Sequence, residues 1–168
     1  MENDYSIFYI LESNLILCIH SINSTKWEYI INAYNIIINR ISQNHLDKFY
    51  KLKLINCRKI LCEFVNIETL PYIPNIVEIS CIYCNLQYLE DIYPNCKIFI
   101  VDENKLKKIP YLPKCEILYC SANQLKCLPV IPDCMKKIWC KNNPELVYNE
   151  IIAKKFNLEY PPSKKYII

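Results

Sequence analysis

Cysteine is the residue type in this chain best suited to chemistry, because 11 cysteines and two histidines occur among its 168 residues. Zinc sites usually combine two C-x-x-C or His pairs into four ligands. The chain has a single C-x-x-C, from Cys81 to Cys84, and neither His20 nor His45 lies near it in the sequence. The four-ligand pattern is incomplete, so we expect no metal site and no cofactor.

The acidic residues offer weaker chemistry. Glu90 precedes Asp91, and Asp102 precedes Glu103, but adjacent carboxylates at a turn or strand end are usually solvated surface. The chain contains no glycine, which excludes glycine-rich phosphate loops, dinucleotide-binding fingerprints and the nucleophile elbow. We therefore predict that the protein is not an enzyme. The alternative, a hydrolase or transferase with an unrecognised site, would require titratable groups with perturbed pKa values in a closed cleft.

The positions of the cysteines follow an internal repeat. Segments that start at residues 57, 76, 96, 115 and 135 share the pattern L-x-x-L-x-L-x-x-N/C-x-L, with Cys or Ile often in place of Leu. In the fifth segment the last apolar residue slips by one position, to Leu146. Free cysteine behaves as a small buried hydrophobe. The repeat therefore accounts for seven cysteines as core residues, namely Cys57, Cys62, Cys81, Cys96, Cys115, Cys120 and Cys140.

Each repeat of 19 or 20 residues can supply one short strand and one return segment, and stacking of repeats creates the core. The fourth and sixth positions, such as Leu118 and Cys120, should point inward from the strand. The N/C position should satisfy backbone groups of neighbouring coils through a side-chain amide, and it holds Asn104, Asn123 and Asn143. Val65 departs from this pattern, so we expect an irregular first coil.

Paired prolines follow each strand, in segments 70–74, 109–113 and 128–132, and segment 89–94 keeps only the second proline. Proline favours an extended or polyproline-like return path. Over residues 57–146 the chain therefore resembles the leucine-rich repeats of bacterial secreted effectors. The resemblance implies an α/β repeat fold: a short leucine-rich-repeat solenoid with a parallel concave sheet and an extended convex side. The glycine-free composition with 14 tyrosines is typical of AT-rich genomes, such as those of some giant DNA viruses.

We divide the chain into an N-terminal capping segment (1–52), the repeats (53–146) and a C-terminal cap and tail (147–168). The first part should contain a hairpin of strands 7–11 and 15–19, a helix over 25–41 and a shorter helix over 46–52. A closing helix is expected over 144–156. Its expected inward residues are Leu146, Val147, Ile151 and Ile152.

The N-terminal segment, the apolar runs, the net charge and the cysteine count indicate the cellular location and the class of partner. The N-terminus is acidic, and Glu12, Ser13 and Asn14 interrupt the first apolar stretch, so we expect no signal peptide. No run of about 18 apolar residues occurs, so no membrane span is expected. The net charge of +3 is small and scattered, which argues against nucleic acid as a partner. The odd number of cysteines then favours a reducing, cytoplasmic location, the host cytoplasm if the protein is viral.

The outward strand positions supply the candidate binding surface. They place five apolar residues side by side, with Lys137 and Asp102 at the border: Ile98, Ile100, Ile117, Tyr119 and Trp139. Such patches mark protein interaction sites, so we predict a protein-binding scaffold that uses its concave face. The patch could instead be covered by a terminal segment or by self-association. A second hypothesis is a ubiquitin-ligase substrate adaptor in which residues 1–52 recruit the ligase, although these residues lack the Leu-Pro-x-Glu opening of F-box segments.

Overall fold

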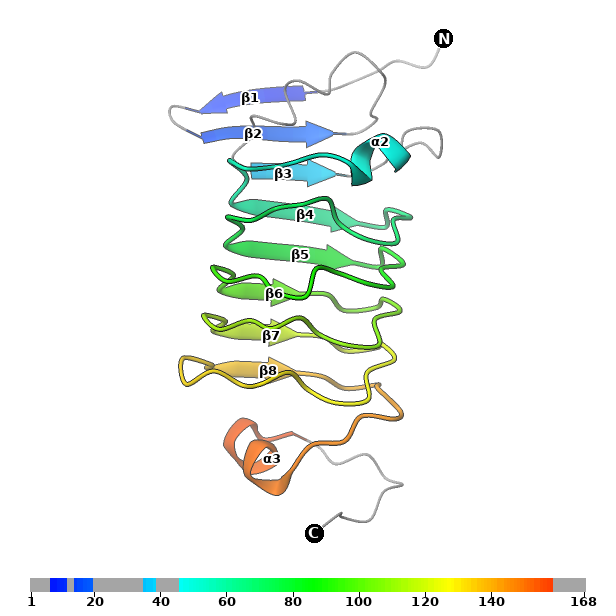
Figure 1. Ribbon diagram of the computed structural model, residues 1–168, viewed down its shortest axis with the longest axis vertical. Coiled ribbons are helices and arrows are strands. Elements are labelled where there is room, and N and C mark those ends of the chain that lie inside the picture. The colour runs from blue at the N-terminus through cyan, green and yellow to red at the C-terminus, as the bar shows by residue number, and fades with distance from the viewer. Residues whose placement is uncertain (1–6, 12–13, 20–34, 39–45, 159–168) are drawn as a thin grey trace.

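A computed structural model describes residues 7–11, 14–19, 35–38 and 46–158 (Figure 1). Within these residues, eight strands form one sheet in the order of the sequence. Strand β1 pairs antiparallel with β2, and every pairing from β2 to β8 is parallel. The strands are β1 (Ile7–Leu11), β2 (Asn14–Ile19), β3 (Asn35–Ile38), β4 (Lys59–Glu63), β5 (Glu78–Ile82), β6 (Ile98–Ile100), β7 (Ile117–Tyr119) and β8 (Lys137–Trp139).

The register of the parallel sheet confirms the repeat frame. Fourth-position residues lie opposite one another across the strands, as Phe99 does with Leu118 and Leu118 with Ile138. Together with the sixth-position residues they form two buried columns, and Leu118 and Cys120 are fully buried. The structure is thus a parallel-sheet solenoid with about five turns in the repeat region, as the spacing of apolar residues predicts.

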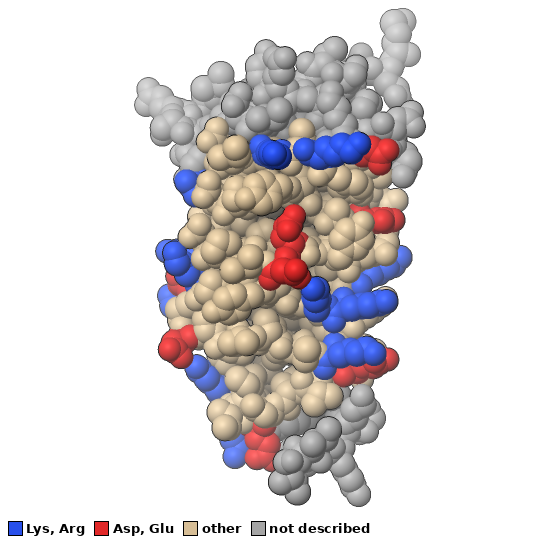
Figure 2. All heavy atoms as spheres, in the orientation of Figure 1, with Lys and Arg blue, Asp and Glu red and all other residues tan. Residues whose placement is uncertain are grey.

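The return segments that connect β4 to β8, all of which the structure describes, contain no helix. Single bridges join neighbouring segments, as between Ile92 and Tyr111 and between Lys53 and Tyr72. Figure 2, in the orientation of Figure 1, looks onto these segments: charged side chains gather mainly along the two margins, with a short acidic row in the middle. Prolines in the segments explain this extended course, because proline cannot donate to a helical ladder.

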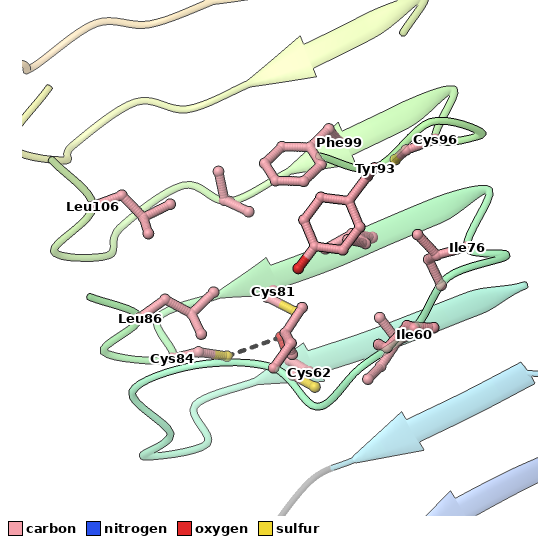
Figure 3. Packing of buried hydrophobic residues seen from close by; sticks show 14 of the residues in the cluster. Ile60, Cys62, Ile76, Cys81, Cys84, Leu86, Tyr93, Cys96, Phe99 and Leu106 are labelled. Carbon is pink, nitrogen blue, oxygen red and sulfur yellow. Dashed lines mark hydrogen bonds between the residues drawn. The ribbon is translucent and has the colours of Figure 1, made fainter. Parts of the chain in front are cut away.

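The core lies between the sheet and the return segments (Figure 3). Tyr93 comes from a return segment and packs against Phe99 of β6, with ring centroids 6.0 Å apart. Cys84 replaces asparagine in the second coil, and its thiol donates to the backbone oxygen of Cys62 at 3.3 Å. Strand and return residues therefore share one core, which neither could bury alone.

The three asparagines at the N/C position form a buried ladder between coils, as expected. Asn104 Oδ1 accepts hydrogen bonds from the backbone amides of Cys84 (3.1 Å) and Leu86 (2.9 Å), while Nδ2 donates to the Cys81 oxygen (2.7 Å). Asn123 and Asn143 make similar bonds one and two coils further on, although within the described chain the oxygen of each accepts from one amide only. Each amide side chain thus supplies bonds that the short strands do not reach.

One residue before the N/C position, every coil turns with a left-handed backbone conformation. The five residues have φ between 51° and 57°: Phe64, Tyr83, Glu103, Ala122 and Asn142. Left-handed conformations cost non-glycine residues roughly 1–2 kcal/mol each, and this chain has no glycine. The first coil turns in the same way, and Val65 is buried. The expected irregularity of the first coil is therefore wrong, because the backbone course does not depend on the asparagine there.

The predicted helix over 25–41 is wrong where the structure describes it. Residues 35–38 form β3, whose buried Ile36 and Ile38 lie opposite Ile60 and Cys62 of β4. A short apolar run fits both helical and strand periods, and pairing with β4 decides for the strand. The other residues of the predicted helix lie outside the described residues. The sheet itself continues across the division drawn at residue 52, through β3 to β2.

The remaining terminal elements lie close to their expected positions. Strands β1 and β2 match the predicted hairpin within one residue, and α2 (Leu46–Tyr50) falls within the predicted helix over 46–52. Their role as a cap stays a prediction.

The closing helix is shorter than expected. Helix α3 (Glu150–Phe156) begins after Asn149, whose side chain accepts from the Ile152 amide at 2.9 Å. Leu146 is buried as expected, but Val147 is exposed and Ile151 is 75% exposed. Both were expected to point inward. The N-cap at Asn149 starts the helix after Val147, which bridges to Cys127 instead, and within the helix Ala153 is the buried residue.

Candidate functional site

The candidate site is the outer sheet face, defined as the strand side chains of β4–β8 that point away from the core. Parallel register aligns Ile98, Ile117 and Lys137 in one row across β6, β7 and β8, and Ile100, Tyr119 and Trp139 in the next row. Trp139 is 47% exposed, and the four other apolar residues are half-buried. We call the apolar residues of these two rows the apolar strip; its members are Ile98, Ile100, Ile117, Tyr119 and Trp139. The strip runs over three strands, because each repeat contributes equivalent positions.

Two lysines flank the exposed end of the apolar strip. Lys137 Nζ lies 5.0 Å from the centroid of the Tyr119 ring and 5.7 Å from that of Trp139. Lys141 Nζ lies 5.3 Å from the centroid of the Trp139 ring. These distances are within the range of cation–π contacts, about 6 Å. The indole is therefore positioned by two cations, and both cations stay at the surface.

Asp102 takes part in a contact between coils. Its Oδ1 accepts a hydrogen bond of 2.6 Å from the backbone amide of Ser121, on the next coil. Burial raises the pKa of the Asp102 carboxyl, and the hydrogen bond from Ser121 opposes this shift. Asp102 thus links the chain just after β6 to the chain just after β7. It also lies at the border of the apolar strip.

A hollow of about 170 Å³ adjoins the strip beyond β8. Trp139 and Lys141 line its side towards the sheet, and Tyr148, Phe156 and Leu158 line it from the C-terminal segment. The sequence carried no signal for this hollow, because its lining joins a repeat strand to a segment outside the repeats.

The cysteines behave as core residues. The ten whose side chains the structure describes are free thiols, eight of them buried, with Cys127 and Cys134 exposed. Burial raises the pKa of Cys84 to about 12 and that of Cys140 to about 11. Neutral thiols are poor nucleophiles and poor metal ligands. Among the described residues, no group of three or more His, Cys, Asp or Glu side chains is arranged to hold a metal ion.

The return face is a second apolar surface, which the sequence interpretation treated only as a return path. It exposes a column of large side chains at equivalent positions: Tyr72, Ile92, Tyr111 and Val130. An ion pair of 2.6 Å between Lys108 and Asp91 lies on the same segments. The repeated position between the two prolines is the signal that could have revealed this column.

A further exposed aromatic pair lies where the first two coils turn. The rings of Phe64 and Tyr83 are stacked, 5.0 Å apart and 6° from parallel. Both residues hold the left-handed turn position, so the turn presents them to solvent.

Within the described part of the chain, no helix is both long and apolar enough to span a bilayer. Comparison of the sequence with protein-family models, with curated proteins and with solved structures found no match.

Proposed function

We propose that this protein is a leucine-rich-repeat scaffold that binds another protein through its outer sheet face, without catalysing a reaction. The observation that carries the proposal is the apolar strip, which ends in an exposed tryptophan held between two lysines. Tryptophan and tyrosine are enriched among the residues that dominate protein–protein binding energy. An apolar centre with charged neighbours also matches the usual anatomy of an interface.

The outer sheet face is favoured over the return face for two reasons. Its aromatic side chains are already oriented by cation–π contacts, so that binding requires little further ordering. A hollow adjoins it and can receive a partner side chain.

The proposal is tested by comparing two double variants in binding to proteins captured from the native cell. Tyr119→Ala with Trp139→Ala should weaken binding by at least about 1–2 kcal/mol, as expected for aromatic hot spots. Tyr72→Ala with Tyr111→Ala removes two exposed rings from the return face and should leave binding unchanged.

Melting curves of both variants must first show that the fold is kept. If the sheet-face variant still binds every captured protein with wild-type affinity, the proposal is wrong. Loss of binding in the return-face variant alone would move the binding site to the opposite surface.

A further inference from the structure

We propose that the β8 end of the outer sheet face binds an acidic segment of the partner, with a large apolar side chain next to its carboxylates. This inference rests on the proposed function and specifies the chemistry of the partner. It is carried by the charge of Lys137 and Lys141 around Trp139, by the carboxylates near β8 and by the hollow beyond β8.

Lys137 contributes positive charge at the β8 end of the apolar strip. The contacts of its ammonium group within the described chain are with the rings of Tyr119 and Trp139, and neither ring carries a full negative charge. The neighbouring strand offers Ile117 at the equivalent position, so no carboxylate lies beside Lys137 in the register. A partner carboxylate can therefore approach this ammonium group without displacing an existing ion pair.

Two carboxylates near β8, within the part of the chain that the structure describes, are already bound to other lysines. Glu116 pairs with Lys136 at 2.5 Å. Glu145 pairs with Lys126 at 3.3 Å. Neither glutamate is therefore paired with Lys137, which brings its positive charge to the β8 end of the apolar strip. Electrostatic complementarity then favours an anionic segment and disfavours a cationic one.

The hollow beyond β8 supplies the apolar half of the proposed site. Its volume of about 170 Å³ is similar to an apolar cavity of about 150 Å³ that accommodates benzene in another protein. Its lining combines Trp139, Tyr148, Phe156 and Leu158 with the charged Lys141. A segment that places one large apolar side chain there can set an adjacent carboxylate near Lys141 and Lys137.

Nucleic acid is a poorer fit to the same surface. Its backbone binds through many phosphate contacts made by lysine and arginine, and here two lysines stand at the end of an otherwise apolar strip. The outer sheet face also carries acidic residues at its other end, where Glu78 pairs with Lys59 at 2.8 Å. The surface thus suits a peptide with both apolar and acidic residues.

The probe is a phage-displayed library of random peptides of about ten residues, long enough to cross the five strands when extended. Selection on the whole protein should enrich sequences that place Asp or Glu next to Leu, Phe or Trp. A selected peptide is then synthesised, together with a version whose Asp and Glu are replaced by Asn and Gln. The neutral version should bind about tenfold more weakly, and added salt should weaken the acidic peptide more than the neutral one.

Variants of the protein test whether the lysine charges contribute to binding separately from the aromatic rings of the strip. Lys137→Gln with Lys141→Gln should weaken the acidic peptide about tenfold and leave the neutral peptide nearly unchanged. Lys105→Gln with Lys107→Gln removes the same charge from exposed lysines outside the strip and should change binding less than twofold.

Two kinds of result would contradict the inference, one for the acidic chemistry alone and one for the outer sheet face as well. If Trp139→Ala abolishes binding but Lys137→Gln with Lys141→Gln does not weaken it, the acidic chemistry is wrong and the proposed function stands. Selection of peptides without acidic residues would lead to the same conclusion. If binding of the selected peptides survives Tyr119→Ala with Trp139→Ala, or no peptide is enriched, the outer sheet face is not the binding surface for such segments and the proposed function fails with the inference.

Discussion

Replacement of Asn104 by alanine tests whether the buried ladder of asparagines holds neighbouring coils together. The side chain is 8% exposed. Its oxygen accepts from the amides of Cys84 and Leu86, and its nitrogen donates to the oxygen of Cys81. Alanine offers none of these bonds, so three buried backbone groups of the preceding coil lose a partner.

The expected loss follows from that count. A buried donor or acceptor left without a partner costs about 1–3 kcal/mol, and entry of water into the space should recover part of the loss. Two other carbonyls that Asn104 contacts keep partners, because Val101 also accepts from Asn123 and Asp102 from the amide of Tyr83. We therefore expect Asn104→Ala to lower the free energy of unfolding by roughly 3–5 kcal/mol, a large share of the usual 5–15 kcal/mol.

The assay is urea unfolding followed by circular dichroism, with two matched variants. Gln124→Ala truncates an exposed amide side chain on the next coil and should change stability by no more than about 0.5 kcal/mol. Asn143→Ala should cost less than Asn104→Ala, because the oxygen of Asn143 accepts from one amide, that of Leu125. Equal and small effects for all three variants would refute the ladder.

Three further predictions concern the core, one carboxyl group and the thiols. Leu118→Ala should lower the free energy of unfolding by roughly 2–5 kcal/mol, because the side chain is fully buried; an effect as small as that of Gln124→Ala in the same urea titration would show that the register is wrong. Burial raises the pKa of Asp102, so the ionised carboxylate destabilises the fold above that pKa, and this penalty disappears as the pH falls through it. Asp102→Asn should therefore gain most over wild type near neutral pH and progressively less in acid, and a gain that increases on acidification would contradict this cause. Finally, the melting temperature should be the same with and without reductant, and metal analysis should find no stoichiometric zinc; a large drop on reduction, or one zinc ion per chain, would contradict the assignment of the cysteines to the core.

The part of the fold that was predicted correctly is the part that repeats. Leu118 and Cys120 could be assigned to the core because equivalent residues recur every 19 or 20 positions and coils stack on like coils. The role of Asn104 followed from the same register, since a side chain at the end of a short strand faces unpaired backbone groups.

The elements outside the repeats were predicted less well. Ile36 and Ile38 fit helical and strand spacing equally, and pairing with β4 made them part of the sheet. Val147 and Ile151 were expected to be buried, but the cap at Asn149 starts α3 after Val147, which instead bridges to Cys127, and Ile151 lies on the exposed side of the helix. For β3 the deciding contact comes from a distant strand, whereas for α3 it is the local cap at Asn149, which the predicted start at residue 144 did not take into account.

For the candidate site, the repeat pattern is enough to identify which residues share the outer sheet face. Alternation along a strand and the fixed repeat length place Tyr119 beside Trp139, as the sheet register confirms. Only the packed structure shows that Lys137 and Lys141 lie over the indole and that Tyr148 and Phe156 close a hollow beside it. The physical reason is that repeat spacing sets the position of each backbone, whereas side-chain direction and the packing of the terminal segment depend on contacts between coils.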